Sequence, residues 1–211
     1  MTKTKLFFDT EFTGLHQNTT LISLGIVSEC GKKFYAEFID YDKSQIDDWL
    51  QENIIDKLKF TEHITASCGG WESNPRDTNE YDNALEMALR RKDADLGELY
   101  CIGKTPMIVN RLEDWLEQFD EVEMWSDCLS YDWVLFSQLW RHAFNIPKNV
   151  YYIPFDICTM FKLKHIDPDI SREKYAYGDV NKEMSDNKHT ALWDAVVIRD
   201  CFIKLEARSI I

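Results

Sequence analysis

The first 39 residues contain three apolar runs separated by short links, and this pattern restricts the fold more than any other feature of the chain. The runs cover residues 5–9, 21–28 and 33–39 and are rich in β-branched and aromatic side chains. Gly14 and Gly31 mark turns between them. Because links this short favour antiparallel neighbours, we predict that three strands open the chain and begin a sheet.

After residue 40 the apolar residues recur mainly at helical spacing. The elements predicted there, in chain order, are a helix over 46–58, a helix over 108–119, a strand over 121–126, a helix over 131–144, a strand over 150–155, a helix over 156–164 and a helix over 191–207. The later strands are joined through helices and should therefore lie parallel. The order predicts an α/β fold with a mixed five-stranded sheet flanked by helices.

Residues 61–105 are the least readable part of the chain. Gly69, Gly70 and Pro75 interrupt a polar stretch that contains one short helical candidate, at 84–91. A loop of this length either has a function, such as covering a substrate cleft, or is a surface insertion. We assign it no chemistry and interpret residues 1–211 as a single domain with an insertion at 61–105.

Size and charge limit the classes of protein that the chain can belong to. With 211 residues, 45% of them hydrophobic, it can form one domain with a substantial core. The formal net charge of −13 argues against electrostatic capture of a long nucleic-acid duplex, which usually needs a basic surface. An enzyme that binds only a few nucleotides remains open, because bound cations would offset part of the acidic field.

The cysteines and the N-terminus bear on where the protein is found. The six cysteines are scattered and form no C-x-x-C pair, which favours reduced core thiols over a zinc or redox motif. The N-terminus lacks the long hydrophobic stretch and small-residue cleavage site of a signal peptide, and no apolar run is long enough for a transmembrane span. We expect a cytoplasmic protein with no membrane partner.

Acidic residues in separate segments are the first candidates for chemistry. Asp9 ends the first predicted strand and Glu11 lies two positions further on, so by the alternation of strand residues their side chains should share one face. Asp132 lies near the start of a predicted helix with Ser130 as the expected N-cap, where the helix dipole favours a negative charge. Four aromatic residues are expected to pack that helix inward and leave Asp132 at the margin of the sheet: Trp133, Phe136, Trp140 and Phe144.

His189 and Asp194 form the last candidate pair. Five helical steps turn a side chain by about 140°, so the two cannot share one face of a helix. We therefore predict that His189 precedes the last helix, that Thr190 is its N-cap, and that Asp194 lies one turn into it. This arrangement would let Asp194 bind a metal ion while the imidazole reaches a water molecule.

Each of these residues also has an ordinary interpretation when taken alone. Paired acids at a strand end are often surface charges, an acid in a first helical turn is common, and a loop histidine is usually just exposed. It is their combination that favours a shared site. Four other acids are interpreted as structural: Asp127 at a strand end, Asp156 as a helix N-cap, and Asp186 and Asp200 outside the motif spacing.

Together these segments resemble the three motifs of the DEDD superfamily of 3′-5′ exonucleases, in its histidine branch (DEDDh). The D-x-E motif matches Asp9 and Glu11, the aromatic-Asp motif matches Asp132 after Tyr131, and the H-x4-D motif matches His189 and Asp194. The opening residues 8–12 and Trp193 look most like a compact bacterial exoribonuclease subgroup of mycobacterial type. The resemblance implies an RNase H-like fold.

The resemblance also implies a mechanism and a cofactor. Asp9, Glu11, Asp132 and Asp194 would bind two divalent cations, Mg²⁺ or Mn²⁺, since these ions prefer oxygen ligands. His189 would be the catalytic base that takes a proton from the attacking water. The expected reaction is metal-dependent hydrolysis from the 3′ end of a single strand, RNA favoured over DNA, with nucleoside 5′-monophosphates as products.

Substrate contacts follow from the same resemblance. The backbone around Thr10 and Phe12 and the Leu15 side chain would hold the terminal nucleotide, with Phe12 as a stacking surface of low base specificity. Phe12 and Leu15 could equally be core residues, and Trp193 is interpreted as core. The family usually has asparagine a few residues before the aromatic residue of its second motif, where this chain has Asp127, so a substrate contact there is in doubt.

Other functions remain as alternatives. A non-catalytic nucleotide-binding protein on the same fold would normally have lost some of the carboxylates, and all are present here. A DNA-trimming or proofreading exonuclease would use the same chemistry, whereas a polynucleotidyl transferase or endonuclease would not need the H-x4-D pair. A homodimer is left open, because no residues are assigned to an interface.

Overall fold

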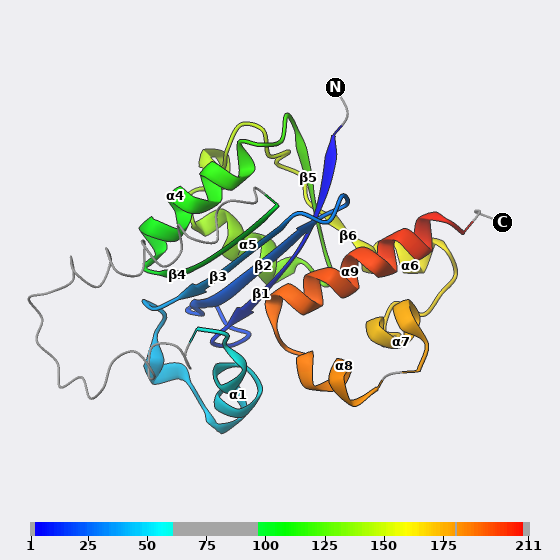
Figure 1. Cartoon of the computed structure of the whole chain (residues 1–211), viewed down its shortest axis with the longest axis horizontal. Coiled ribbons are helices and arrows are strands. Elements are labelled where there is room, and N and C mark those ends of the chain that lie inside the picture. The colour runs from blue at the N-terminus through cyan, green and yellow to red at the C-terminus, as the bar shows by residue number, and fades with distance from the viewer. Residues whose placement is uncertain (1–2, 61–96, 180, 209–211) are drawn as a thin grey trace, which may run out of the picture.

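A mixed sheet of six strands forms the centre of the computed structural model, which describes residues 3–60, 97–179 and 181–208 (Figure 1). The strands lie in the order β4-β3-β2-β1-β5-β6. The prediction of an α/β fold with a mixed sheet and flanking helices is confirmed, and the predicted number of five strands is wrong. The predicted helix at 84–91 lies outside the described residues.

The first three strands form an antiparallel meander, as their short links predict. β1 (Thr4–Phe12) pairs with β2 (Leu21–Ser28), and β2 pairs with β3 (Lys33–Phe38). β1 extends three residues beyond the predicted strand, so Glu11 lies in the strand with Asp9. The two acids therefore occupy alternate positions of one regular strand, on the same face.

The strand that the sequence analysis missed is β4 (Glu98–Gly103), which pairs in parallel with β3 at the edge of the sheet. It falls at the end of the stretch 61–105, where no regular structure was predicted apart from the helix at 84–91. Only four residues between Glu98 and Gly103 are apolar or aromatic, which is too short a pattern to predict a strand by itself. Pairing with β3, 65 residues earlier in the chain, organises this segment instead.

The last two strands lie parallel to β1, as the helical crossovers predict. β5 (Val122–Ser126) pairs with the first half of β1, and β6 (Phe155–Asp156) pairs with the end of β5. The strand predicted at 150–155 is much shorter, because Val150 makes only an isolated bridge to Val122. Pro154 has no N–H group to donate, which is consistent with the interrupted ladder.

Two helices cover one face of the sheet. They are α4 (Thr105–Leu116) and α5 (Ser130–Gln138), and between them and the strands lies a core that includes Leu6, Phe8 and Phe136. The helix predicted at 131–144 is shorter than expected, because Arg141 adopts a left-handed φ of 64° and a separate 3₁₀ turn, η3 (Ala143–Asn145), follows. Phe144 is 78% exposed, so the prediction that it packs inward is wrong.

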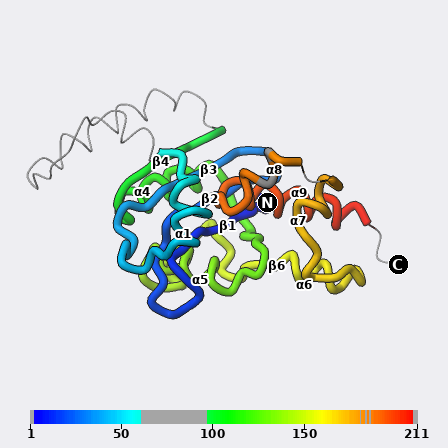
Figure 2. The backbone as a smooth tube through the Cα atoms, turned by 90° about the horizontal axis from the view of Figure 1, so that it is seen from below, coloured from blue at the N-terminus to red at the C-terminus, as the bar shows by residue number. Residues whose placement is uncertain are grey.

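The opposite face carries the C-terminal part of the chain. Phe7 packs there against α9 (Ala191–Glu206) and α6 (Ile157–Leu163), and α7 (Arg172–Tyr177) packs on α9. In Figure 2 the group formed by α6, α7 and α9 lies apart from α4 and α5. α8 (Lys182–Asn187) precedes α9, and neither α7 nor α8 was individually predicted.

The helix predicted over 46–58 consists of three short pieces. These are η1 (Lys43–Gln45), α1 (Asp48–Asn53) and η2 (Ile55–Lys57). Leu50, Ile54 and Leu58 pack on Ile22 at the start of β2. Trp49, an apolar residue of this predicted helix, is 52% exposed.

Two further expectations concern the cysteines and membrane-spanning helices, and the described residues test both. Cys101 and Cys201 are buried and form no disulfide, as predicted, whereas Cys30 and Cys128 also form no disulfide but are exposed, so they are not core residues. Both exposed cysteines lie in turns, and the spacing of cysteines in the sequence could not predict this exposure. Among the described helices, none has the length and apolarity that a membrane span requires.

Gly25 in β2 permits a close approach between the backbone of a helix and the sheet. A Cβ atom at this position would lie 2.3 Å from the backbone carbon of Ala191 and 2.3 Å from the backbone nitrogen of Leu192, at the start of α9. Gly25 is the residue of β2 that pairs with Asp9 of β1. The absent side chain therefore lets the first turn of α9 rest directly on the sheet beside Asp9.

We predict that Gly25→Ala lowers the free energy of unfolding by about 3 kcal/mol, because the obstructing atoms belong to backbone that cannot rotate away. Gly103→Ala is a matched control, since its new Cβ would meet the flexible side chain of Met107. Urea denaturation of the two variants measures the difference. An equal loss in both would contradict the importance of this contact.

Candidate active site

Asp9 and Glu11 project from the face of β1 that α9 covers. Phe7 on the same face packs into the core against α9, so Asp9 and Glu11 continue that row toward the C-terminal end of the strand. Glu11 is only 9% exposed, and Asp9 is partly buried. The sequence prediction that the two carboxylates share one face is confirmed.

The last helix adds Asp194 to the same face. Asp194 lies in the first turn of α9, one turn beyond the contact of Ala191 with Gly25. Its Oδ2 accepts a hydrogen bond of 3.0 Å from the backbone N–H of His189. Ligand atoms of Glu11, His189 and Asp194 all lie within 4.8 Å of one another. Residues separated by about 180 positions in the sequence thus meet in one cluster.

His189 precedes the helix, as its five-residue separation from Asp194 predicts. It adopts a left-handed φ of 64°, and its ring makes an edge-on contact with Trp49, with centroids 5.4 Å apart. Thr190 occupies the N-cap position, but its hydroxyl donates to the carbonyl of Asn187 and does not cap the helix. Instead, the carboxylate of Asp194 accepts a hydrogen bond from the backbone N–H of His189. This bond fixes the chain just before the helix begins.

Asp132 reaches the cluster from the other face of the sheet. Its Oδ1 accepts two hydrogen bonds from Thr10, one of 3.1 Å from the backbone N–H and one of 2.5 Å from the hydroxyl. Both bonds fall on the same oxygen of the carboxylate. The prediction that Ser130 is the N-cap of this helix is wrong by one position. Leu129 occupies the N-cap position, and Ser130 is the first helical residue.

Burial and, after it, repulsion by neighbouring carboxylates raise the pKa values of all four carboxyl groups. Burial, followed by the charges of Asp132 and Asp194, raises the pKa of Asp9 well above its ordinary value. Burial and then the charge of Asp194 raise the pKa of Glu11 to about 8.

The other two acids shift in the same direction. Burial raises the pKa of Asp132 to about 6, although the hydrogen bonds from Thr10 oppose the shift. Burial and then the charge of Glu173 raise the pKa of Asp194 to about 7. Lys57 lowers the pKa of Glu11, and Lys188 and Lys57 lower that of Asp194, but these charges only partly offset the effect of burial and repulsion.

The donor set fits a hard divalent cation. Asp9, Glu11, Asp132 and Asp194 offer carboxylate oxygens, which Mg²⁺ and Mn²⁺ prefer. A divalent cation would offset the repulsion that, after burial, contributes to these raised pKa values. The fit therefore rests on two observations, the chemistry of the oxygens and a negative charge that Lys57 and Lys188 only partly offset.

The pKa of His189 moves in the opposite direction. Burial, followed by the charges of Lys188 and Lys57, lowers it below its ordinary value. The imidazole is therefore neutral at pH 7 and can accept a proton. Lys57 also donates a 2.6 Å hydrogen bond to the carbonyl of Lys188, which ties η2 to the loop that carries His189.

The residues expected to contact substrate occupy different environments. The backbone N–H of Thr10 is already taken by Asp132, so Thr10 positions that carboxylate. Phe12 stacks on Tyr131, with ring centroids 5.6 Å apart and planes 17° from parallel. Leu15 is 76% exposed, which excludes the core interpretation for this residue. Trp193 packs against Tyr177 in the core on the α9 face, as expected.

Three of the acids interpreted as structural have partners that account for them. Asp156 caps α6 by accepting from the backbone N–H of Cys158 at 2.9 Å, and Asp200 accepts from the hydroxyl of Tyr177 at 2.8 Å. Asp127 is held by the guanidinium of Arg172, with Nε at 2.6 Å. Asp186 is exposed on α8.

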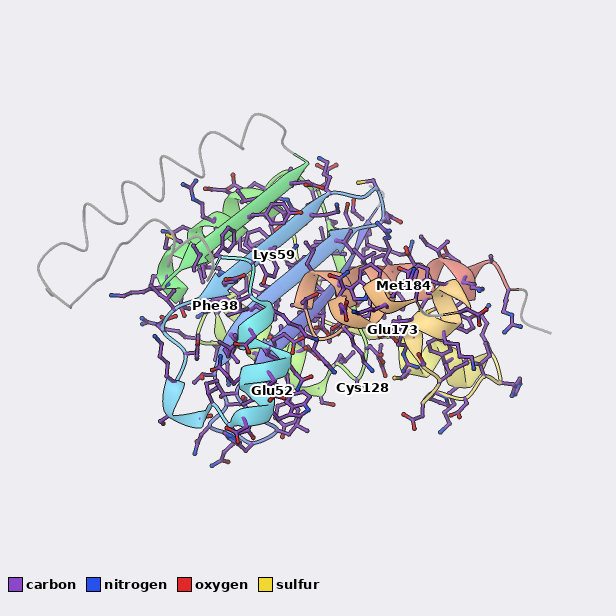
Figure 3. All side chains as sticks on the ribbon, turned by 60° about the horizontal axis from the view of Figure 1, so that its bottom comes forward. Phe38, Glu52, Lys59, Cys128, Glu173 and Met184 are labelled. Atoms are coloured by element: carbon purple, nitrogen blue, oxygen red, sulfur yellow. The ribbon has the colours of Figure 1, made fainter. Side chains whose placement is uncertain are left out.

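Sequence reasoning missed several residues that shape the site. Glu173 on α7, labelled in Figure 3, is 8% exposed and adds a fifth negative charge near Asp194. Trp49 and Lys57 come from the segment predicted as a single amphipathic helix. Nothing in the sequence indicated that these three residues shape the site. Gly25 was also missed, although an isolated glycine within a strand often marks a close backbone approach and could have indicated the contact with α9.

Comparison with known proteins places the chain among 3′-5′ exoribonucleases. A family model described as a 3′-5′ exoribonuclease Rv2179c-like domain matches residues 4–204. Since the match covers nearly the whole chain, the protein belongs to the Rv2179c-like 3′-5′ exoribonuclease domain family. The expected likeness to exoribonucleases of mycobacterial type is confirmed at this level.

Two curated relatives come from Mycobacterium tuberculosis. They are the 3′-5′ exoribonuclease Rv2179c of strain H37Rv and the 3′-5′ exoribonuclease MT2234.1 of strain CDC 1551. This chain is 25% identical to each over 146 residues, a stretch that covers 69% of this chain and 67% of the relative.

Without a divalent cation, the raised pKa values predict that stability falls as pH rises. Unfolded Asp and Glu titrate near 4, whereas Asp132, Asp194 and Glu11 titrate at about 6, 7 and 8 in the folded protein. Between these limits the folded chain binds more protons than the unfolded chain. The destabilisation from these three groups is therefore absent below about pH 4 and is complete above about pH 8.

The variant Asp194→Asn isolates one of these groups. We expect its stabilising effect over wild type to grow by roughly 2 kcal/mol between pH 5 and pH 8, measured by denaturant unfolding with a chelator present. Asp186→Asn, at an exposed aspartate close in sequence, is the control. An effect of Asp194→Asn that does not change with pH would show that the pKa of this carboxyl is not raised in the folded protein.

Proposed function

We propose that this protein is a metal-dependent 3′-5′ exoribonuclease of the DEDDh type on an RNase H-like fold. It would hydrolyse single-stranded nucleic acid from a free 3′ end, with RNA favoured over DNA, and release nucleoside 5′-monophosphates. The observation that carries the proposal is the convergence of Asp9 and Glu11 from β1, Asp132 from α5 and Asp194 from α9, with His189 beside them.

The four carboxylates would hold two divalent cations, Mg²⁺ or Mn²⁺. When bound, such ions lower the pKa of a coordinated water molecule and offset negative charge on the scissile phosphate. The protein side chains keep the carboxylates in place for this role. Thr10 fixes Asp132 through two hydrogen bonds, and the N–H of His189 fixes Asp194.

His189 would accept the proton of the attacking water. Its lowered pKa keeps the imidazole neutral at physiological pH, so that a ring nitrogen is free to take the proton. The edge contact with Trp49 restricts the ring, and Lys57 holds the preceding carbonyl. The base is thereby positioned from two elements outside its own loop.

The terminal nucleotide would lie against Phe12 and Leu15. Phe12 is already stacked on Tyr131, so the pair offers a rigid aromatic surface that any base can stack on. Leu15 projects from the link between β1 and β2 and is free to contact the sugar or base. The net charge of −13 is compatible with this short footprint, since the cations supply the positive charge that the surface lacks.

Family membership supports the exoribonuclease activity. Experiments distinguish this activity from the alternative functions. A non-catalytic nucleotide-binding protein would bind the 3′ end without cleaving it. A DNA-trimming enzyme would remove nucleotides from DNA as fast as from RNA. A cytoplasmic location and a homodimer remain part of the proposal and are tested by fractionation and by light scattering.

The decisive assay uses end-labelled single-stranded RNA and DNA of one sequence, each with a free or a blocked 3′ end. We expect Mg²⁺- or Mn²⁺-dependent shortening of the free RNA with release of 5′-monophosphates. Asp132→Asn should abolish it, and His189→Ala should lower kcat by about 10²-fold to 10⁴-fold. Asp186→Asn is the matched control and should retain activity. Internal cleavage of the 3′-blocked strand would refute the assignment.

Leu15→Ala tests the substrate contact separately from the chemistry. The substitution should raise KM about fivefold to tenfold and leave kcat and the unfolding midpoint nearly unchanged, because the exposed side chain supports no core. Leu163→Ala, at an equally exposed leucine on α6, is the control (69% exposed). The same KM for Leu15→Ala and wild type would remove Leu15 from the proposed contacts.

A further inference from the structure

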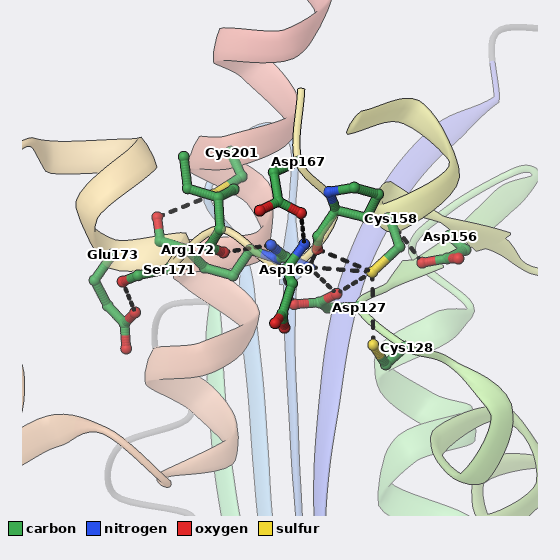
Figure 4. A network of polar contacts seen from close by, with 12 residues as sticks. Asp127, Cys128, Asp156, Cys158, Asp167, Asp169, Ser171, Arg172, Glu173 and Cys201 are labelled. Atoms are coloured by element: carbon green, nitrogen blue, oxygen red, sulfur yellow. Dashed lines mark hydrogen bonds and ion pairs between the residues drawn. The ribbon is translucent and has the colours of Figure 1, made fainter. Parts of the chain in front are cut away.

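A pair of thiols lies beside the candidate active site, where the end of β5 meets the start of α6 (Figure 4). The Sγ atoms of Cys128 and Cys158 are 3.5 Å apart. Cys158 also donates a hydrogen bond of 2.8 Å to Oδ1 of Asp127. The proposed nuclease chemistry uses none of these three residues.

Arg172 of α7 closes the cluster on its inner side. Its Nε lies 2.6 Å from Oδ2 of Asp127, and its Nη2 lies 2.9 Å from Oδ1. The same Nη2 lies 3.1 Å from Sγ of Cys158. A guanidinium at this distance repels a metal cation and already neutralises Asp127, so the two thiols and the carboxylate make a poor metal site. The thiols themselves are the reactive part of the cluster.

The two cysteines differ in their access to solvent. Cys128 is exposed in the turn between β5 and α5, whereas Cys158 is partly buried in the first turn of α6. A small oxidant therefore reaches Cys128 first, and the sulfur of Cys158 is already in contact with the sulfur that reacts. An exposed thiol with a resolving thiol next to it is the arrangement from which a disulfide forms.

We propose that Cys128 and Cys158 are a modification site at which a peroxide forms a reversible disulfide. The sulfur of Cys128 attacks the O–O bond of hydrogen peroxide, which gives a sulfenic acid and one water. The sulfur of Cys158 then attacks the sulfenic sulfur, and a second water leaves as the S–S bond forms. The two thiols lose two protons and two electrons, and the peroxide is reduced to two waters.

The surroundings of the thiols set the rate of this step. Burial raises the pKa of Cys128, and burial with the hydrogen bond to Asp127 raises that of Cys158 far above its ordinary value. Since the thiolate is the nucleophile, oxidation is slow at neutral pH and accelerates as pH rises.

The disulfide would act on Asp132, and this consequence rests on the proposed function. Cys128 lies four residues before Asp132, and its carbonyl accepts a 2.7 Å hydrogen bond from Ser130 at the start of α5. Bond formation shortens the Sγ–Sγ distance from 3.5 Å to about 2.05 Å and pulls this turn toward α6. A displacement of about 1 Å at a catalytic group lowers turnover by roughly 100-fold.

The test treats the reduced full-length protein with hydrogen peroxide and identifies its peptides by mass spectrometry without reduction. We expect a loss of about 2 Da and a peptide pair joined through Cys128 and Cys158. A Cys30→Ser, Cys68→Ser double variant, which lacks two other cysteines, should form the same pair. Cys128→Ser should not form it.

Activity on the labelled RNA is measured in parallel. Oxidation should lower kcat of the wild type at least about tenfold, dithiothreitol should restore it, and Cys128→Ser should keep its activity throughout. Irreversible oxygen addition at Cys128, without the peptide pair joined through Cys158, would contradict the proposed disulfide. A fully formed disulfide with unchanged kcat would overturn its link to Asp132. Absence of activity before oxidation would instead overturn the proposed function, and the peptide result would still decide the site.

Discussion

The contact between the backbone of α9 and Gly25 of β2 is the constraint on which the rest of the site depends. It removes the layer of side chains that normally separates a helix from a sheet, and so the first turn of α9 lies beside Asp9. Asp194 can then share a site with Asp9 and Glu11, although α9 begins about 180 residues after β1. A larger residue at position 25 would lift the whole end of the helix and separate these carboxylates.

The cluster shows how stability and function oppose each other in this fold. Burial and repulsion raise the pKa values of the four acids, which means that the folded chain is destabilised by its own site at neutral pH. The remaining structure offsets this cost through two well-packed cores, one on each face of the sheet. The hydrogen bonds from Thr10 and His189 hold the carboxylates in place despite the repulsion.

Sequence patterns predicted the parts of the molecule that depend on local order. The strand alternation of Asp9 and Glu11, the position of His189 before its helix and the helix cap at Asp156 each follow from neighbouring residues. Features that depend on distant partners could not be predicted in this way. β4 is organised by its pairing with β3, Phe144 is exposed by the left-handed turn at Arg141, and Glu173 reaches Asp194 only through the packing of α7 on α9.

The bonds between Thr10 and Asp132 also determine where the sheet stops. The N–H of Thr10 points away from β2 and would be available to a longer β5, but the carboxylate of Asp132 occupies it. A side chain thus substitutes for a neighbouring strand over the last part of β1. An insertion that extended β5 would compete with Asp132 for this donor. The length of the β1–β5 pairing and the position of the Asp132 carboxylate therefore cannot change independently in this chain.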